Sequence, residues 1–249
     1  MQTQFNPAIF KSYDVRGVYP SELNDDVAYQ IGRCFVNLLK TKSIAVGRDM
    51  RPSGERLYEA FARGATEAGA DVVYVGMVST DALYFAVGKY GYGGGVMITA
   101  SHNPAQYNGM KFTRDAAQAI SLETGLSTIR DQIASDALPP KADKAGTISQ
   151  RDVLDEFAQH CLSFIDPKQI KPFKIAIDAG NGMAGETVPH VFKHLRCEVI
   201  PLFFELDGSF PNHPASPIEP ENMRDLQAAV LQYHCDLGVA FDGDADRMF

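Results

Sequence analysis

The sequence alternates two hydrophobic patterns, which predict strands and helices in turn. Apolar runs of about four to six residues are typical of strands buried in a sheet, and apolar residues spaced three or four positions apart are typical of covering helices. The predicted strands are 5–15, 43–47, 71–76, 96–98, 109–112, 173–178, 197–202 and 236–241. The predicted helices are 24–40, 53–68, 80–90, 122–135, 152–165, 182–195 and 223–233.

This alternation predicts an α/β fold with two three-layer α/β/α domains, whose sheets are mixed and mostly parallel. The segment 109–112 follows its predecessor too closely for a helical crossover, so we expect it to return as an antiparallel hairpin partner. A stretch rich in proline and charge at 138–144 is the best linker candidate. We therefore expect a first domain at 1–145 and a second at 146–249.

The composition excludes several classes of function. The chain carries a net charge of −8 at pH 7, with 45% hydrophobic and 22% charged residues. A nucleic-acid surface would show a basic stripe, no apolar run is long enough to span a bilayer, and the first six residues lack the segments of a secretion signal. The four cysteines are scattered, without the close pairs of a zinc site or a disulfide framework. We expect a cytoplasmic protein with neither a nucleic-acid nor a membrane partner.

One candidate active site follows the predicted strand 96–98. The strand ends in Ser101-His102-Asn103-Pro104, a cluster of polar residues after a buried run. In sheets flanked by helices, strand ends of this kind are where ligands bind. Ser101 therefore lies at a plausible active-site position, while a simple polar turn is the alternative.

A second candidate site follows the predicted strand 236–241. The sequence Asp-Gly-Asp-Ala-Asp-Arg at 242–247 places three carboxylates at alternate positions, which can bend around one hard cation such as Mg²⁺. A calcium EF-hand is excluded because its glycine and glutamate continuation is missing and a strand precedes the loop. A solvated acidic turn is the alternative, but aspartates this dense repel one another without a cation.

Together these two motifs resemble the α-D-phosphohexomutase family. Two further stretches agree, Phe-Lys-Ser-Tyr-Asp-Val-Arg-Gly at 10–17 and Tyr-Asn-Gly-Met-Lys-Phe at 107–112. They are similar to the phosphomannomutase/phosphoglucomutase branch, and the opening pattern of the phosphoglucosamine branch is absent. The resemblance implies an enzyme that interconverts hexose 1-phosphate and hexose 6-phosphate, with mannose or glucose phosphate as substrate. It also implies Mg²⁺ as cofactor and hexose 1,6-bisphosphate as intermediate and activator.

The resemblance also implies roles for individual residues. Ser101 would carry the phosphoryl group, and the metal would be held by Ser101, Asp242, Asp244 and Asp246. The other implied catalytic residues are Lys111, His102 and Arg16, and the implied substrate-binding residues are Tyr13, Arg247 and Asn103. His102 is the intuitive base because it adjoins the serine and titrates near neutrality. The family instead points to Lys111, with a pKa that cationic neighbours would lower.

The sequence alone allows two interpretations for several residues. Tyr13 either lies near the substrate or packs as a strand aromatic. Arg48 and Arg51 either face a phosphate or, as we expect, belong to a solvated loop after the strand 43–47. His213 lies in a loop with four prolines, where a solvent-exposed or structural role is expected rather than a catalytic one.

The resemblance covers only part of the family's four-domain enzyme. The chain ends at Phe249, and no stretch matches the sugar-reading loop of the third domain or the phosphate-clamping loop of the fourth. We therefore expect an N-terminal half, without domains III and IV, that turns over poorly alone. The alternatives are a non-catalytic fragment that binds magnesium and sugar phosphate, a phosphoglucosamine mutase-like enzyme, and a phosphatase or bisphosphate synthase using the same serine.

Overall fold

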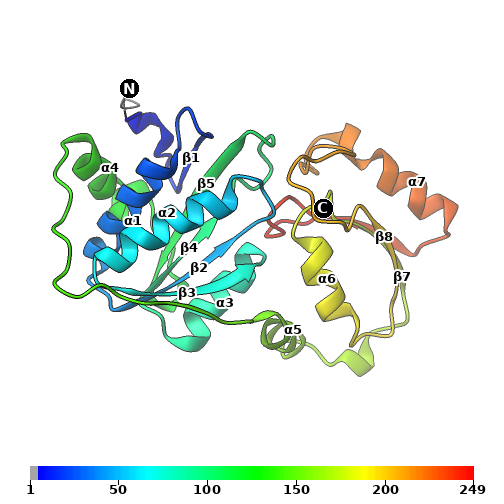
Figure 1. The fold of residues 1–249 in the computed structure, drawn as a ribbon. Helices are drawn as coiled ribbons and strands as arrows, with labels where there is room; N and C mark the ends of the chain where they lie inside the picture. The colour runs from blue at the N-terminus through cyan, green and yellow to red at the C-terminus, as the bar shows by residue number, and fades with distance from the viewer. Residues whose placement is uncertain (1–4) are drawn as a thin grey trace.

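Residues 5–249 are described in the computed structural model and form two sheets, each with helices on both faces (Figure 1). The first sheet and its helices come from the N-terminal part of the chain, and the second from the C-terminal part. The first sheet is mixed and the second is parallel throughout. The predicted fold class is confirmed.

The first sheet has six strands in the order β1-β5-β4-β2-β3-β6. The last four run parallel to one another, while β5 lies antiparallel to both β4 and β1. The strands are β1 (Asp14–Val18), β2 (Ser43–Arg48), β3 (Asp71–Met77), β4 (Gly94–Ile98), β5 (Tyr107–Arg114) and β6 (Ile148–Gln150). The predicted hairpin is therefore confirmed, and it pairs Lys111 of β5 with Met97 of β4.

Five helices cover this sheet. Helices α1 (Asp25–Leu39), α2 (Gly54–Glu67) and α4 (Ser127–Ala134) pack on one face, and α3 (Thr80–Tyr90) and α5 (Leu154–Leu162) on the other. Because side chains alternate along a strand, Ile44 and Val46 of β2 join the core with α1, whereas Ala45 joins the core with α3. The polar loops that follow the strands are thus carried by a sheet buried on both sides.

The second sheet is smaller and has the order β8-β7-β9. Its strands are β7 (Lys174–Asp178), β8 (Glu198–Leu202) and β9 (Leu237–Ala240). Ile175 and Ile177 of β7 pack with α6 (Ala184–Phe192), while Ala176 packs with α7 (Arg224–Gln232). The carboxyl end of β9, which carries the aspartate motif, thereby reaches the edge of the second domain that faces the first (Figure 1).

Two strands differ from the prediction. The predicted strand 5–15 is wrong over most of its length, because Asn6 and Pro7 start a short 3-10 turn and β1 begins only at Asp14. Strand β6 was not predicted, because its three exposed residues carry no hydrophobic pattern and it pairs with β3 through its backbone. The domain limits at 145 and 146 stay a prediction, with β6 as part of the first sheet.

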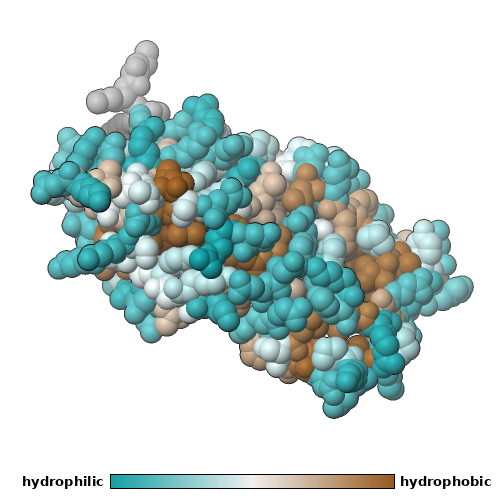
Figure 2. Space-filling model, turned by 60° about the horizontal axis from the view of Figure 1, so that its bottom comes forward, coloured by the Kyte–Doolittle hydropathy of each residue, from teal (hydrophilic) through white to brown (hydrophobic). Residues whose placement is uncertain are grey.

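None of the helices within residues 5–249 is long and apolar enough to cross a membrane. Figure 2 shows a face that is mostly hydrophilic, with hydrophobic side chains in separate patches. The predicted lack of a secretion signal concerns residues 1–6, of which 1–4 lie outside the described residues.

Candidate active site

The serine loop begins where β4 ends at Ile98. Ser101 is only 2% exposed and has φ of +50°, a left-handed conformation that is uncommon for residues other than glycine. Its backbone N–H donates to the hydroxyl of Thr99 at 2.8 Å, and the N–H of Asn103 donates to the carbonyl of Ala100 at 3.0 Å. Because such a conformation persists only where its surroundings enforce it, the loop holds Ser101 in one orientation.

The aspartate loop begins where β9 ends at Ala240. The chain turns at 242–247 and returns antiparallel, with Phe241 bridged to Met248. Gly243, at the start of the turn, lies against Ser101. A Cβ at this glycine would be 2.4 Å from the carbonyl oxygen of Ser101. The two loops can therefore meet only because residue 243 has no side chain.

Side chains of the two loops are in direct contact. The hydroxyl of Ser101 donates to the carboxylate of Asp242 at 2.6 Å, although 141 positions separate the two residues. The backbone N–H of Thr80, at the start of α3, donates to the carbonyl of Asp244 at 3.1 Å, and the Thr80 hydroxyl donates to the Asp244 carboxylate at 2.6 Å. The structure therefore brings the predicted serine and acidic loops together, with α3 as a further support.

The three aspartates fit a divalent cation. One oxygen from each carboxylate lies within 4.8 Å of the others. Oδ1 of Asp244 and Oδ1 of Asp246 are buried and accept no hydrogen bond, which is costly unless a cation or water meets them. Carboxylate oxygens are the ligands that Mg²⁺ prefers. Burial and the charge of Asp244 also raise the pKa of Asp242, which a cation beside the loop would oppose.

Lys111 already neutralises part of this acidic cluster. Its ammonium donates to Asp244 at 2.6 Å and to Asp246 at 2.5 Å. Burial acts to lower the pKa of Lys111, but the two carboxylates outweigh it and raise the pKa above its usual value. The predicted lowering by cationic neighbours is therefore wrong for this arrangement, because the nearest charges are anions. The two carboxylates therefore favour the charged ammonium form of Lys111.

Arg247 ends the aspartate loop, and its side chain reaches the serine loop. Its Nε donates to Asp242 at 3.0 Å, and one terminal nitrogen donates to the hydroxyl of Ser101 and to Nδ1 of His102 at 2.6 Å. Nδ1 of His102 therefore acts as an acceptor, as in a neutral imidazole. Burial lowers the pKa of His102, and the positive charge of Arg247 lowers it further. His102 is thus held neutral beside Ser101.

Of the remaining predicted residues, Arg16 and Asn103 contact each other at the serine loop, whereas Tyr13 is exposed. Arg16 of β1 donates to Asp14 at 2.5 Å, to the carbonyl of Ala100 at 3.2 Å, and to the side chain of Asn103. Arg16 and Asn103 thus brace the serine loop together. Tyr13 is 76% exposed, so the alternative of a packed strand aromatic is wrong.

Two family models cover most of the chain. Residues 7–139 match the phosphoglucomutase/phosphomannomutase alpha/beta/alpha domain I, and residues 154–249 match domain II. The chain belongs to the phosphoglucomutase/phosphomannomutase family. The resemblance seen in its sequence motifs is confirmed.

Relatives within this family are similar along nearly the whole chain. A phosphomannomutase of Escherichia coli is 41% identical over 96% of this chain and 54% of its own length. A Xanthomonas campestris protein named phosphohexose mutases is 40% identical, over 96% of this chain and 53% of its own length. A crystal structure of a family protein from Burkholderia thailandensis has a TM-score of 0.90 at 37% identity, over 98% of this chain and 54% of that one. The chain spans about half the length of the relatives it matches.

Two residues that support this candidate site, Thr80 and Arg51, were missed or misjudged from the sequence. Thr80 was seen only as a helix start, although the N-terminus of a helix favours a nearby carboxylate. Arg51 was expected in a solvated loop, but it is 1% exposed and paired with buried Asp49 at 3.2 Å. Burial raises the pKa of Asp49, while Arg51 and a hydrogen bond from Thr99 oppose the rise. A buried ion pair cannot be read from a polar loop sequence, because only the tertiary structure covers it.

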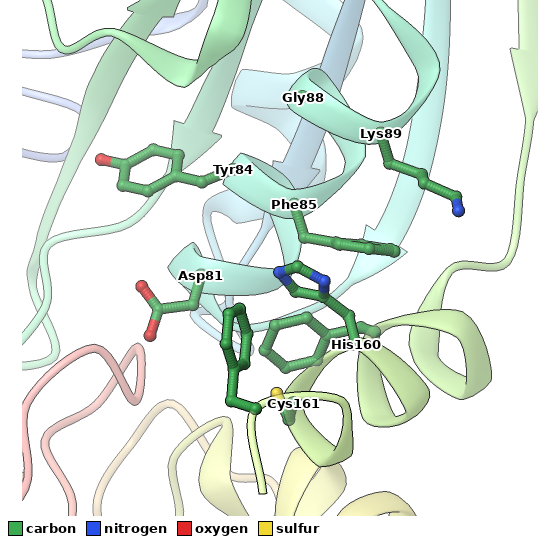
Figure 3. Close-up of a pocket in the computed structure, with 9 residues that line it drawn as sticks. Asp81, Tyr84, Phe85, Gly88, Lys89, His160 and Cys161 are labelled. Carbon is green, nitrogen blue, oxygen red and sulfur yellow. The ribbon is translucent and has the colours of Figure 1, made fainter.

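A groove of about 610 Å³ lies next to the candidate site, between α3 and α5 (Figure 3). Its wall is aromatic, and the rings of Phe85 and His160 are tilted by 34° with their centroids 4.9 Å apart. The carboxylate of Asp81 points away from these rings. Burial, and the charges of Asp246 and Asp244, raise the pKa of Asp81 to about 6. Asp81 therefore lines the groove and is also affected by the charges of the aspartate loop.

His213 has the structural role that was expected of it. Its Nε2 lies 3.0 Å from the carboxylate of Asp178, which is buried at the end of β7, and its ring packs edge-on against Phe203. The hydrogen bond with Asp178 raises the pKa of His213, against the opposing effect of burial. This ion pair fastens the loop with four prolines to the second sheet.

Replacing His213 with glutamine should therefore destabilise the chain more at pH 6 than at pH 9. A raised pKa means that the folded state holds a proton which the unfolded state releases, so the stabilisation is complete below about pH 6.5 and is lost as pH rises through the folded pKa. Because a hydrogen bond to a charged group is worth more than a neutral one, we expect the loss in free energy of unfolding to be larger at pH 6 by on the order of 1 kcal/mol. Urea unfolding at both pH values measures it, with the exposed His234→Gln as control. Equal losses at both pH values would contradict the ion pair.

Proposed function

We propose that this chain supplies the phosphoryl-carrying serine and the metal loop of a phosphohexomutase. In the proposed reaction, phospho-Ser101 donates its phosphoryl group to a hexose phosphate, and the hexose 1,6-bisphosphate returns its other phosphoryl group to Ser101. The observation that supports this proposal best is the hydrogen bond of 2.6 Å between the Ser101 hydroxyl and Asp242 in a cluster of three carboxylates. A hydroxyl beside a cation cradle is what reversible phosphoryl transfer needs.

The charges around Ser101 suit a phosphoryl group. A phosphoserine carries about −2, and the three aspartates add to it. Lys111 and Arg247 contact these aspartates directly, while Arg16 braces the adjoining loop. We propose Asp242, Asp244, Asp246 and Ser101 as the ligands of Mg²⁺. When bound, Mg²⁺ would supply charge neutralisation at the transferring group.

Two residues are proposed to handle protons and orientation. As an ammonium, Lys111 stabilises negative charge, and it can accept a proton only where Asp244 and Asp246 no longer hold it. His102 is neutral and receives a hydrogen bond from Arg247, so we propose that it orients the guanidinium beside the serine hydroxyl. Tyr13, exposed near the start of β1, and Asn103 are proposed to meet the substrate.

The proposed substrate class is hexose phosphate, mannose or glucose phosphate. The relatives named phosphomannomutase and phosphohexose mutases support this class, and they do not separate the two sugars for this chain. The cytoplasmic location stays a prediction.

Incubation with hexose 1,6-bisphosphate and Mg²⁺ tests the proposal. We expect the intact mass to rise by one phosphate group, and peptide mapping to place that group on Ser101. Release of inorganic phosphate without a phosphorylated serine would favour a phosphatase instead. A folded chain that binds Mg²⁺ but never carries phosphate on Ser101 would contradict the proposed function.

A further inference from the structure

A buried arginine, Arg51, holds the serine loop through hydrogen bonds to its backbone. The Arg51 side chain is buried and donates to four backbone carbonyl oxygens of that loop and of the first residue of β5. The acceptors are those of Ser101 at 2.9 Å, Asn103 at 2.6 Å, Pro104 at 2.8 Å and Tyr107 at 2.9 Å. We propose that Arg51 is a positioning residue that fixes Ser101 for phosphoryl transfer, an inference that rests on the proposed function.

Every N–H group of the Arg51 guanidinium has a partner. A guanidinium carries five donors and no acceptor. Its two terminal nitrogens bond the four carbonyls, and Nε donates to Asp49 at 3.2 Å. Because no donor is left over, Arg51 cannot also bind a phosphate, which was one interpretation of its loop. Lysine offers three donors at one point and cannot reproduce this planar pattern.

The backbone carbonyl and the backbone N–H of Ser101 are both linked by hydrogen bonds to the same ion pair, Asp49 with Arg51. The carbonyl of Ser101 accepts directly from Arg51. The N–H of Ser101 donates to Thr99, whose hydroxyl donates to Asp49 at 2.7 Å. Asp49 and Arg51 thus hold the backbone of Ser101 at both its N–H and its carbonyl. This explains how a non-glycine residue keeps φ of +50°.

The second domain also packs against this arginine. The ring centroid of Phe210 lies 5.1 Å from the guanidinium carbon of Arg51. A Cβ at Gly208 would be 2.6 Å from the Cα of Arg51. Arg51 therefore lies between the serine loop and a loop of the domain that carries the aspartates. It couples the position of Ser101 to the docking of the second domain.

Hydrogen–deuterium exchange tests the positioning role without any activity. In Arg51→Lys we expect peptides covering 101–107 to exchange at least about tenfold faster, because their carbonyl anchors are lost, while peptides of α1 and α7 stay unchanged. The matched control is Arg48→Lys, since among residues 5–249 Arg48 donates to the carbonyl of Asp49 and faces exposed Glu55 at 3.7 Å, without a hydrogen bond to 101–107. Unchanged exchange at 101–107 in the folded variant would overturn the proposal.

Phosphorylation of Ser101 by hexose 1,6-bisphosphate and Mg²⁺ tests the consequence for transfer. We expect the rate at saturating bisphosphate to fall about 100-fold in Arg51→Lys, since a small misplacement of a reacting group has this effect. The bisphosphate concentration for half-maximal rate should stay within about twofold, because Arg51 has no donor left for the substrate. A general loss of structure would change both quantities.

The outcomes separate the two proposals. A wild-type chain that is never phosphorylated refutes the proposed function. A wild-type chain and an Arg51→Lys variant that are phosphorylated at the same rate refute the positioning role alone. If circular dichroism shows that Arg51→Lys does not fold, Thr99→Val takes its place, because it removes the link between the Ser101 N–H and Asp49. That variant should show the same faster exchange and slower transfer, and wild-type behaviour in it would overturn the proposal.

Discussion

Ser101→Ala is expected to abolish phosphoryl uptake from hexose 1,6-bisphosphate, by at least about 10³-fold. The serine hydroxyl is the only proposed acceptor, and it donates to Asp242 while receiving a hydrogen bond from Arg247. The neighbouring hydroxyl of Thr80 is already committed to Asp244 at 2.6 Å. Alanine keeps the backbone and its anchors, so we expect the fold to survive and only the acceptor to be lost.

Intact mass over time measures this loss. The control is Ser21→Ala, which removes an exposed serine outside the site and should leave the uptake unchanged. Circular dichroism of Ser101→Ala should match that of the wild-type chain. Phosphate that still accumulates on the alanine variant would show that another residue is the acceptor, and the proposed mechanism would then be wrong.

Asp244→Asn is expected to weaken Mg²⁺ binding by at least roughly 100-fold, since even partners of metal ligands contribute 10- to 100-fold. Asp244 is fully buried, one of its oxygens accepts from Lys111 and Thr80, and the other accepts no hydrogen bond. An amide removes the negative charge and turns part of this cradle into a donor. The pKa of Lys111 should also fall toward its usual value, because one of the two carboxylates that raise it is gone.

Isothermal titration with Mg²⁺ measures the first effect. Asp143→Asn is the matched control, because it makes the same change of charge at an exposed position of the predicted linker. Asp143→Asn should bind Mg²⁺ as the wild-type chain does. An Asp244→Asn chain that binds Mg²⁺ with unchanged affinity would mean that the cation binds elsewhere, and the proposed metal loop would have to be abandoned.

The sequence determined those features that depend on neighbours along the chain. Helix α1 was predicted within one or two residues, because the Asn24 side chain caps it by accepting the N–H of Val27 and its apolar residues repeat at helical spacing. The hairpin of β4 and β5 followed from the short connection between them. The family, and with it the candidate residues, followed from short motifs of consecutive residues. The roles of those residues stay predictions.

The tertiary structure alone decided what depends on contacts between distant segments. Strand β6 pairs through its backbone, so its side chains carry no signal of it. Arg51 became a buried anchor because carbonyls some 50 positions away converge on it. The direction of the Lys111 pKa was set by carboxylates more than 130 positions later in the chain. Hydrophobic period and capping act within a few residues, whereas burial and electrostatic partners are fixed only when distant segments pack together.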